Sequence, residues 1–446
     1  MDLNGVRVLV VGMKRTGMAA ASLLASHGAR VRATDLKGLD ALSGAREQLA
    51  GLGIPFEIQS PRVFEGCDWM VISPDVPAGL EPLEAARKRG VRVIGDLELA
   101  APLLKGKTIG VTGSNGKTTT TSLIGHIFGA GGVAAQVGGN IGTPVCAMVE
   151  TSREGMWNVL ELSSFQLETV DTFRAEIGVA LNVTQNHLDR HHTMERYAAA
   201  KARLFETQRS GDTAVLNADD AICAAFASRG PAQARWFSLL REVESGAWVS
   251  GGQVLLDGSP LMSLSGIPIR GRHNVQNVMA AALAASRAGV PREDIAAAVR
   301  TFRAVEHRLE FVRAVRGVEF YNDSKATSVD ATLKALDAFP GGLWVVLGGK
   351  DKGSDYAPLR EPLARKAHAA LLIGAAAGKI ASQLRGAVEL VDAGTLDQAV
   401  AHAWSRAAAG DTVLLAPACA SFDQFDSFEH RGETFKDLVM ELNPGI

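Results

Sequence analysis

A glycine-rich loop at residues 112–120 carries the clearest chemical signal in the chain. The run Thr-Gly-Ser-Asn-Gly-Lys-Thr-Thr-Thr follows the apolar segment 107–111 and precedes a segment able to form a helix. The backbone N–H groups of such a loop, together with the N-terminus of the next helix, bind phosphate groups. In this arrangement Lys117 places a positive charge beside the outer phosphates, and Thr118 offers a hydroxyl to Mg²⁺.

The loop departs from the complete GxxxxGK[ST] pattern, because Val111 occupies the position of its first glycine. A tight glycine turn without chemical consequence is therefore the alternative interpretation. The preceding strand, the two glycines, the lysine and the threonine together favour an ATP site. The predicted ATP contacts of this loop are Gly113, Ser114, Asn115, Gly116, Lys117, Thr118 and Thr119.

Polar residues follow two further apolar segments of the same region. Glu161 ends the segment 158–162, and His187 and Asp189 follow the segment 177–183. The carboxyl ends of parallel strands meet at one edge of a sheet, where ligands bind. Because Mg²⁺ prefers oxygen ligands, Glu161 is the better candidate ligand and His187 a less usual one. A structural carboxylate at the end of a strand is the alternative for Glu161.

Three other polar side chains of this region are expected at the surface. His191 and His192 are interpreted as solvated loop residues. Lys201, taken from the sequence alone, is one more helix lysine of the kind that lies in water.

The amino terminus carries a second glycine pattern. Residues 12–17 begin and end with glycine and directly follow a short apolar run. A dinucleotide-binding fingerprint is found at this position in Rossmann folds. Its middle glycine is absent, and Lys14 would put a side chain where a pyrophosphate needs close backbone approach. Asp35, at the end of the next strand, is a possible ribose acceptor. There are three alternatives for this segment: an NAD(P) site, a site for a different nucleotide-bearing substrate, and a scaffold without a ligand. We favour the site for a different nucleotide-bearing substrate.

Three polar blocks in the last third of the chain also follow apolar segments. They comprise residues 322–327, 348–353 and 417–425, and each groups small polar residues, with cationic ones in the first two. Each block by itself could be a turn. Their shared position after strands favours a binding edge.

These motifs need a framework of strands and helices. Apolar segments alternate with helix-like ones from the amino terminus, again from residue 107 and again from residue 343, which predicts parallel sheets. Residues 247–269 are typical of small antiparallel strands instead. We therefore predict an α/β fold of three domains: a Rossmann-like domain at 1–97, a central P-loop ATPase-type parallel sheet with a small antiparallel sheet at 98–302, and a C-terminal Rossmann-like domain at 303–446.

The composition is that of a soluble globular protein, with 446 residues, 47% of them hydrophobic and 21% charged. A net charge of -2 with both signs dispersed argues against nucleic-acid and membrane partners. The chain shows no basic leader and no long apolar stretch, so we expect a cytoplasmic protein, and a monomer. Four cysteines lie far apart without a CxxC pair and are predicted to be packing residues: Cys67, Cys146, Cys223 and Cys419.

Six segments, spread in order over nearly the whole chain, resemble those of the Mur ligases, the ATP-dependent enzymes that build the peptide stem of bacterial peptidoglycan. The run TGSNGKTTT is similar to the ATP loop of that family. The segments ELSSFQLE, NVTQNHLDRH, GRHNVQN, NDSKATS and APACASFDQF are most similar to those of the members that add D-glutamate. The resemblance implies ATP and Mg²⁺ as cofactors, and UDP-N-acetylmuramoyl-L-alanine and D-glutamate as small-molecule substrates.

The resemblance also implies roles for individual residues. Lys117 and Thr118 would hold the ATP phosphates and magnesium, Glu161 would ligate that magnesium, and His187 would help to ligate a second one. Lys201 matches a lysine that the family carbamylates, and a carbamate turns a cation into an oxygen ligand. The implied catalytic set is Lys117, Glu161, His187 and carbamylated Lys201, and the implied metal set is Thr118, Glu161, His187 and Lys201.

Contacts with the three substrates follow in the same way. Further ATP contacts would come from Asn274, Asn277, Arg308, Asp323 and Lys325. The UDP-linked substrate would meet Lys14, Arg15, Thr16, Asp35, Ser73, Asn140, Ser163 and Gln166. D-Glutamate would meet Thr327, Lys352, Ser421 and Phe428. The chain departs from the family pattern at Leu36, Lys37, Asp75 and Ser328.

In the implied reaction the L-alanine carboxylate attacks the γ-phosphate of ATP, and the amine of D-glutamate then displaces phosphate through a tetrahedral intermediate. Three substrates must be aligned away from water, so we expect domain closure in which the third domain moves most. The alternatives are an amide ligase that adds another amino acid or extends a folate with glutamate, an NAD(P)-dependent oxidoreductase, and a non-catalytic ATP-dependent switch.

Overall fold

The computed structural model describes residues 2–42 and 44–443, apart from the side chain of Asp189. The chain forms two compact units. The first comprises residues 1–264 and 276–299, and the second comprises residues 265–275 and 300–446. The predicted boundaries near residues 97 and 303 stay predictions.

The first unit begins with a five-stranded parallel sheet in the order β3-β2-β1-β4-β5. This is the Rossmann strand order without its sixth strand, which confirms the predicted class of the N-terminal domain. Its strands are β1 (Arg7–Val11), β2 (Arg30–Asp35), β3 (Phe56–Ile58), β4 (Trp69–Ile72) and β5 (Arg92–Gly95). Its helices are α1 (Arg15–Ser26), α2 (Ala45–Gly51) and α3 (Glu81–Lys88).

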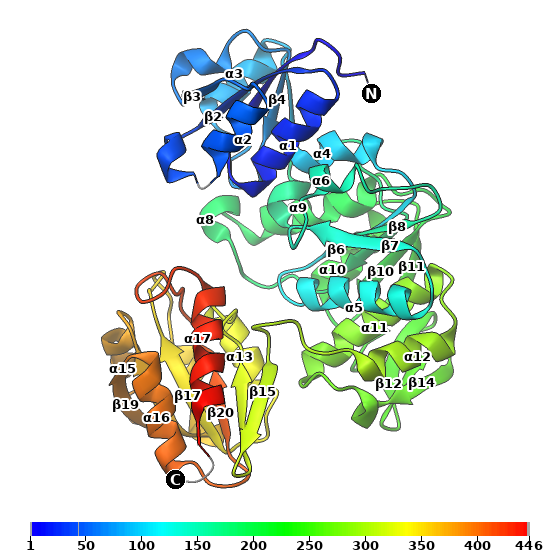
Figure 1. Ribbon diagram of the computed structural model, residues 1–446. Helices are drawn as coiled ribbons and strands as arrows, with labels where there is room; N and C mark the ends of the chain where they lie inside the picture. The colour runs from blue at the N-terminus through cyan, green and yellow to red at the C-terminus, as the bar shows by residue number, and fades with distance from the viewer. Residues whose placement is uncertain (1, 43, 444–446) are drawn as a thin grey trace. The chain divides into compact units, whose positions relative to one another are not determined.

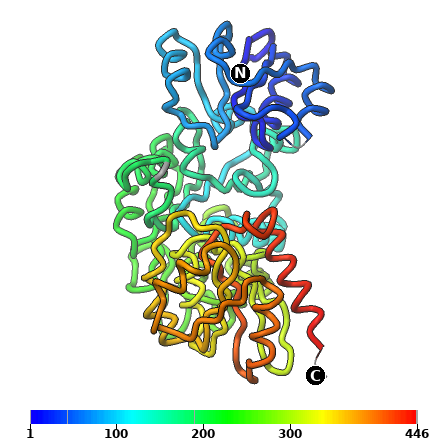
Figure 2. The backbone as a smooth tube through the Cα atoms, turned by 90° about the vertical axis from the view of Figure 1, so that its left-hand side faces the viewer, coloured from blue at the N-terminus to red at the C-terminus, as the bar shows by residue number. Residues whose placement is uncertain are grey.

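The turn between β1 and α1 is tight, and Gly17 is required there. A Cβ atom added to Gly17 would lie 1.8 Å from the carbonyl oxygen of Gly12, so no other residue fits without moving the helix. The blue trace in Figure 2 shows how this part of the chain passes back and forth between strands and helices. The glycine pattern therefore serves the close packing of helix on strand.

The central sheet of the first unit has nine strands in the order β14-β13-β12-β11-β10-β9-β6-β8-β7. Seven of them, β6 to β12, run parallel, and β13 and β14 are antiparallel additions at one edge. The strands are β6 (Lys107–Thr112), β7 (Ala135–Gly139), β8 (Trp157–Glu161), β9 (Ile177–Ala180), β10 (Thr213–Asn217), β11 (Gln233–Ser238), β12 (Gly246–Ser250), β13 (Gln253–Leu256) and β14 (Ser259–Ser263).

The antiparallel strands differ from the prediction, because they extend the parallel sheet and do not form a separate small one. β12 pairs in parallel with β11, and two tight hairpins then carry the chain outward along the same edge. Gly251 and Gly252 make the first hairpin turn, both with positive φ, and Gly258 contributes a third positive φ to the second turn. Two-residue turns of this kind keep consecutive strands in one sheet.

Helices cover both faces of the central sheet (Figure 1). The helices of residues 96–301 are α4 (Asp96–Ala100), α5 (Lys117–Ala130), α6 (Val145–Met148), α7 (Ser164–Leu167), α8 (Leu188–His191), α9 (Met194–Glu206), α10 (Ala221–Ala225), α11 (Arg272–Arg287) and α12 (Arg292–Thr301). Single 3₁₀ turns occur along the chain at Leu39–Ala41, Pro61–Phe64, Ala101–Leu103, Phe226–Ser228, Leu264–Gly266 and Ala357–Leu359.

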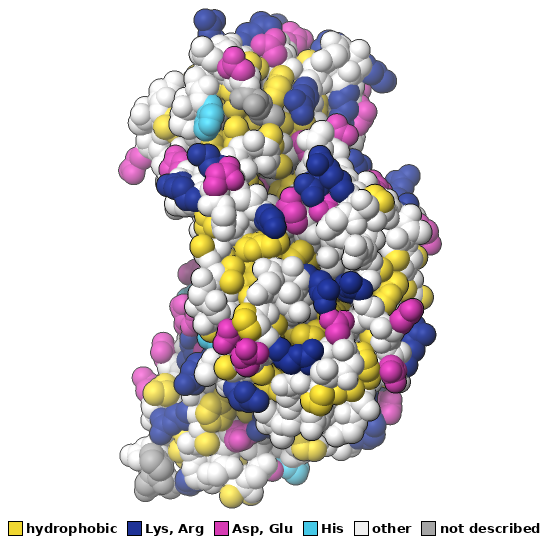
Figure 3. Space-filling view, turned by 90° about the vertical axis from the view of Figure 1, so that its right-hand side faces the viewer, with side chains coloured by type: hydrophobic (Ala, Val, Ile, Leu, Met, Phe, Trp, Pro, Cys, Tyr) yellow, Lys and Arg dark blue, Asp and Glu magenta, His cyan; other side chains and the backbone are white. Residues whose placement is uncertain are grey.

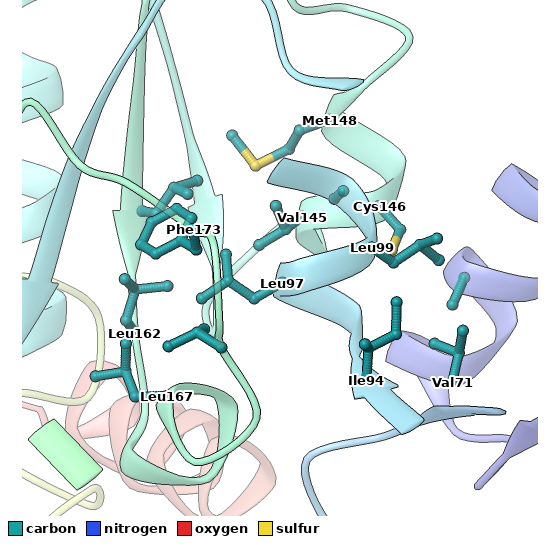
Figure 4. Packing of buried hydrophobic residues seen from close by; sticks show 14 of the residues in the cluster. Val71, Ile94, Leu97, Leu99, Val145, Cys146, Met148, Leu162, Leu167 and Phe173 are labelled. Carbon is teal, nitrogen blue, oxygen red and sulfur yellow. The ribbon is translucent and has the colours of Figure 1, made fainter. Parts of the chain in front are cut away.

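One apolar core joins the N-terminal sheet to the central sheet. In Figure 4, Leu97 and Leu99 of α4 point toward Val145 and Cys146 of α6, with Phe173 on the far side of Leu97. All five side chains are buried, and burial of a large apolar side chain contributes about 1.5–3 kcal/mol. The first two predicted domains are therefore held together by a continuous apolar contact.

The second unit contains a six-stranded sheet in the order β15-β16-β20-β17-β18-β19. β15 and β16 are antiparallel and the other pairs are parallel. The strands are β15 (Glu310–Val315), β16 (Val318–Asn322), β17 (Leu343–Gly348), β18 (Ala367–Ile373), β19 (Glu389–Gly394) and β20 (Thr412–Leu415). The predicted strands near residues 343, 370 and 412 are confirmed as β17, β18 and β20.

Helices pack on both faces of this third sheet, over two apolar clusters. The helices are α13 (Val329–Asp337), α14 (Arg360–Lys366), α15 (Ala377–Leu384), α16 (Leu396–Arg406) and α17 (Phe428–Glu441). α16 and α17 share one cluster with the sheet, and they lie side by side in Figure 1. The sheet is thus covered on both sides, as the prediction of a Rossmann-like domain requires.

The surface and the cysteines agree with the sequence analysis. Lysine and arginine side chains are interspersed with acidic ones on the face shown in Figure 3. All four cysteines are buried with free thiols, which confirms them as packing residues. Among the described residues, none of the helices combines the length and the apolar character that a bilayer crossing needs.

Candidate active site

The predicted ATP loop connects β6 to α5. Gly113 has a φ of 153° and Gly116 a φ of 83°, values that favour glycine. A Cβ atom on Gly116 would also lie 2.3 Å from the side-chain oxygen of Asn277 in α11. Asn277 is one of the predicted ATP contacts, so the structure brings it to this loop.

The loop is fixed by side chains that follow β9. The backbone N–H of Asn115 donates to the side-chain oxygen of Asn182 at 2.9 Å, and Asn182 donates back to the Asn115 carbonyl. The Ser114 hydroxyl donates to the carbonyl oxygen of Thr184 and accepts from its N–H. Tyr197 of α9 lies 3.0 Å from the same hydroxyl. These contacts pre-form the loop and so lower the entropy cost of holding a phosphate chain.

Glu161 and Thr118 meet at the carboxyl edge of the central sheet. The Thr118 hydroxyl, in the first turn of α5, donates to one oxygen of Glu161 at 2.7 Å. Asn140 donates its side-chain amide to the other oxygen at 2.8 Å. Glu161 is 2% exposed, and it makes no ion pair with any described residue. A buried carboxylate beside a hydroxyl offers hard oxygen ligands, which Mg²⁺ prefers.

Lys201 lies inside the protein, so its expected surface position was wrong. It is 1% exposed, its Nζ donates to the carbonyl oxygen of Gly113 at 2.8 Å, and it sits over the ring of Tyr197. Lys117 donates to the same Gly113 carbonyl at 2.9 Å. Burial, and then the neighbouring charge of Lys117, lower the pKa of Lys201 well below its usual range. The helix periodicity of α9 turns this lysine toward the ATP loop.

His187 lies at the N-cap of α8 in a left-handed conformation, with φ of 53°. Its ring makes edge contact with Phe165 at 5.0 Å between centroids and lies 6.4 Å from Tyr197. Tyr197 in turn contacts Lys201. The predicted catalytic residues His187 and Lys201 are thus linked through one aromatic ring.

His191 is not a solvated loop residue, and that expectation was wrong. It ends α8, is 4% exposed, and stacks on Phe165. Its Nε2 lies 2.9 Å from the Ser164 hydroxyl and its Nδ1 lies 3.1 Å from a Glu168 oxygen. Polar loop composition suggested exposure, whereas the folding of residues 188–191 as a short helix turns this side chain inward. His192 is exposed, as expected.

Ser163 and Gln166 form a capping box at the start of α7. The Ser163 hydroxyl accepts the backbone N–H of Gln166, and the Gln166 side-chain oxygen accepts the N–H of Ser163. The Gln166 amide donates to Asp96 of α4 at 3.2 Å. Burial raises the pKa of Asp96 to about 6. The sequence did not indicate a role for Asp96, because its partner Gln166 is 70 residues away in the chain.

The predicted UDP contacts of the N-terminal sheet have structural partners of their own. Asp35 accepts the backbone N–H groups of Met13 and Lys37. The Ser73 hydroxyl donates to the Gly12 carbonyl at 2.7 Å. Because these bonds join β2, β4 and the β1 turn, they hold the loop in place at the carboxyl edge of the sheet.

Two cations stand at the start of α1. Lys14 forms an ion pair with Asp75 at 2.8 Å, and Arg15 and Thr16 lie in the first turn of the helix. Lys14 and Arg15 also line a cavity of about 880 Å³ between α1, α2 and α6. Asp35, Ser73 and Asn140 do not line this cavity, so the structure divides the predicted UDP contacts into two groups.

In the second unit, Asp323 follows β16 in a buried position. Burial raises its pKa to about 7, and the nearby charge of Arg308 acts in the opposite direction. Its carboxylate accepts the backbone N–H of Leu309 at 3.3 Å. Lys325 lies with its Nζ over the Phe428 ring at 3.5 Å from the centroid. The structure therefore groups four predicted ATP and D-glutamate residues around the end of β16.

Ser421 is 1% exposed, and its hydroxyl has no hydrogen-bond partner among the residues that the structure describes. An unsatisfied buried hydroxyl is costly, so such a group in a native fold points to a missing ligand or water. Thr327 lies just before α13, and Lys352 is an exposed residue after β17. Asn274, the remaining predicted ATP contact in this unit, donates to the Arg270 carbonyl.

Arg431 of α17 is a residue of this region that sequence reasoning missed. It is fully buried and donates to Ser324, both through the hydroxyl and the carbonyl, and to the carbonyls of Cys419 and Ala420. Burial lowers its pKa to about 10. A buried cation with neutral acceptors fixes the two loops that carry Lys325 and Ser421. No local motif marks an arginine in a helix as buried.

Among the described residues, no group of three or more His, Cys, Asp and Glu side chains is arranged to hold a metal ion by itself. The predicted magnesium ligands therefore include the hydroxyl of Thr118 and a modified Lys201, in addition to Glu161 and His187.

The fold and the site together define a class of ATP-loop enzymes built from three sheets, and comparison with known proteins identifies the family. The model of the Mur ligase middle domain matches residues 111–285, and that of the Mur ligase glutamate ligase domain matches residues 307–419. A UDP-N-acetylmuramoylalanine--D-glutamate ligase of Solibacter usitatus is 70% identical over 444 residues, covering 100% of each chain. The chain belongs to the Mur ligase family.

Other relatives agree. A protein of the same description from Acidobacterium capsulatum is 51% identical over 99% of this chain and 97% of its own. Among solved structures, the UDP-N-acetylmuramate-alanine ligase MurC from Thermotoga maritima aligns with a TM-score of 0.63 at 17% identity, over 97% of this chain and 99% of its own. At that identity the likeness supports the three-sheet fold alone.

Proposed function

We propose that this chain joins D-glutamate to UDP-N-acetylmuramoyl-L-alanine, with ATP converted to ADP and phosphate, as a step of peptidoglycan precursor synthesis in the cytoplasm. Membership of the Mur ligase family implies the use of ATP. The 70% identical relative is described as the ligase of this reaction. The observation that carries the proposal is the meeting of Thr118, from the ATP loop, with the buried Glu161 at one sheet edge.

The first step is attack of the L-alanine carboxylate on the γ-phosphate of ATP, which releases ADP and leaves an acyl phosphate. Lys117 lies at the start of α5, where the helix N-terminus also favours negative charge. Its ammonium group can therefore offset the charge that spreads over the transferring phosphoryl group.

The second step is attack of the D-glutamate amine on the acyl phosphate, and the collapse of the tetrahedral intermediate expels phosphate. The unsatisfied hydroxyl of Ser421 supports a D-glutamate site in the second unit, with Thr327, Lys352 and Phe428 as further contacts. The charge of Lys325, over the Phe428 ring, is suited to the reacting phosphate.

Thr118, Glu161 and His187 would hold magnesium, together with a carbamate on Lys201. When bound, the metal would neutralise phosphate charge. The lowered pKa of Lys201 supports the carbamate, because only a neutral amine adds to carbon dioxide. The predicted UDP contacts would take the other substrate, and Asn274, Asn277, Arg308 and Asp323 would add to the ATP site. Domain closure also stays part of the proposal.

The test is an assay of ADP formation with UDP-N-acetylmuramoyl-L-alanine and one amino acid at a time. We expect D-glutamate to stimulate ADP release, and L-glutamate, L-alanine and diaminopimelate to have little effect. Stimulation by a different amino acid, or by glutamate with a folate acceptor, would show that the chain is another ligase of the same family.

A further inference from the structure

The short helices α7 and α8 are joined by a buried histidine. α7 carries the capping box of Ser163 and Gln166, and α8 begins after His187. His191, at the end of α8, lies against α7. Neither the predicted site residues nor the proposed reaction gives this histidine a role.

The imidazole of His191 has a polar partner at each nitrogen. Nδ1 lies 3.1 Å from Glu168, whose carboxylate also pairs with Arg190 at 2.9 Å. Nε2 is hydrogen-bonded to the Ser164 hydroxyl at 2.9 Å, and in the neutral ring with its proton on Nδ1 this nitrogen accepts. The hydrogen bond and the contact with Glu168 together restrict the orientation of the ring.

Aromatic packing fixes the remaining freedom of the ring. Phe165 stacks on His191 with centroids 5.5 Å apart and planes at 27°, and Tyr197 lies 5.1 Å away on another side. The Tyr197 hydroxyl reaches Ser114 in the ATP loop. His191 is thus in contact with residues of α7 and α9, and through Tyr197 it is linked to the phosphate loop.

The order carboxylate, imidazole, hydroxyl is also that of a nucleophilic serine with its base. Ser164 is only 3% exposed, and its hydroxyl is used in the bond to His191. A buried hydroxyl cannot reach a substrate carbonyl, so this cluster has no nucleophile. The cluster instead joins α7 and the residue that follows it to α8.

We propose that His191 is a positioning residue for the UDP-linked substrate: by bonding Ser164 it holds the α7 turn so that Ser163, which is fixed by its capping box with the buried Gln166, faces that substrate. Ser164 directly follows Ser163 in the chain, so a shift of Ser164 moves the capping box. The inference rests on the proposed function, because it names the substrate that this turn meets.

The experiment compares three Michaelis constants in variants of the full-length chain. His191→Phe keeps an aromatic ring between Phe165 and Tyr197 but removes the hydrogen bond to Ser164 and the polar contact with Glu168, and Ser164→Ala removes the same hydrogen bond from the other side. We expect either change to raise the KM for UDP-N-acetylmuramoyl-L-alanine about tenfold, with the KM values for ATP and D-glutamate within about twofold.

A double-mutant cycle sharpens the test. If the two side chains act through their shared bond, the double variant has about the same KM as the worse single variant. His192→Phe, a change at the exposed neighbour, serves as the matched control and should leave all three constants unchanged. His191→Gln, which can keep one polar contact, should recover part of the loss.

Two outcomes would overturn the inference. If the three KM values rise in parallel as the unfolding temperature falls, His191 only stabilises the fold. If none of them changes, the bond has no effect on the substrate. Calorimetric binding of UDP-N-acetylmuramoyl-L-alanine to the unmodified chain separates a failure of this inference from a failure of the proposed function. If the unmodified chain binds this substrate but shows no D-glutamate-dependent ADP release, only the proposed function is contradicted. An unmodified chain that does not bind would contradict both.

Discussion

The hydroxyl of Thr118 donates to the carboxylate of Glu161 across 2.7 Å, and this bond joins the ATP loop to the neighbouring strand of the central sheet. The two residues are 43 positions apart in the chain and meet because β6 and β8 are adjacent and parallel. Both groups are buried, so their hydrogen bond is shielded from water. A ligand that binds one of them must therefore affect the other.

Replacing Thr118 by valine tests this pair. Valine keeps the shape of the side chain but removes the donor, and we expect kcat/KM to fall about 100-fold, with a higher magnesium requirement. Thr121→Val is the matched control, since the Thr121 hydroxyl of the same helix has no hydrogen-bond partner. Equal activity of both variants in a steady-state assay would show that the Thr118 hydroxyl has no role.

Replacing Lys201 by methionine should separate function from stability. Burial of the Lys201 amine is costly to the fold, as its lowered pKa indicates, so we expect the unfolding temperature to stay the same or rise while activity falls at least about 100-fold. Lys88→Met, at an exposed helix lysine, should change neither quantity. A fall of several degrees in calorimetry would instead make Lys201 a structural residue.

The carbamate on Lys201 can be examined directly. We expect activity to increase when bicarbonate is added to enzyme prepared without carbon dioxide, because the amine must be modified to supply an oxygen ligand. Activity that is indifferent to bicarbonate, together with a bare amine in an electron-density map of the magnesium complex, would exclude the carbamate.

Asp323 makes stability depend on pH. Its pKa is about 7 in the folded chain and near 3.8 when unfolded, so between these values only the folded chain holds the proton. The stability of the second unit therefore falls as pH rises through that window, by an amount on the order of 4 kcal/mol. Asp323→Asn should flatten this dependence and should be more stable than the unmodified chain at pH 8.

Denaturant unfolding at pH 4, 6 and 8 measures the effect of Asp323. The control is Asp392→Asn, at an exposed position of the same unit, which should keep the slope of the unmodified chain. An unchanged slope in Asp323→Asn would mean that this carboxyl does not carry the proton.

Arg431 should be required for the stability of the second unit. Methionine at this position removes the donor that the buried carbonyls of Ser324 and Cys419 use, and we expect a loss of about 3 kcal/mol. Arg365→Met, at an exposed arginine of α14, is the control and should cost less than about 0.5 kcal/mol. Equal unfolding free energies for the two variants would contradict the assigned role.

The sequence predicted the parts of the site that are local in the chain. The strand, glycines, lysine and threonine of the ATP loop stand next to one another, and Glu161 is marked by the end of an apolar strand. Three parallel sheets were predicted for the same reason, because apolar runs and helical segments alternate regularly.

The sequence did not predict side chains whose position depends on packing between distant elements. His191 and Lys201 are buried because α8 and α9 turn them toward α7 and the ATP loop. Asp96 and Arg431 bond to residues about 70 and 107 positions away. The edge strands β13 and β14 joined the central sheet because two tight turns keep them in it. No local sequence pattern predicts these contacts or this sheet order.

The most direct test of the proposed activity is the product formed from UDP-N-acetylmuramoyl-L-alanine, D-glutamate and ATP. The proposal predicts one amide product, heavier than the UDP substrate by a glutamyl residue in mass spectrometry, for each ADP released. Release of ADP without that product, or its formation in the absence of ATP, would contradict the assignment of this chain as a D-glutamate ligase.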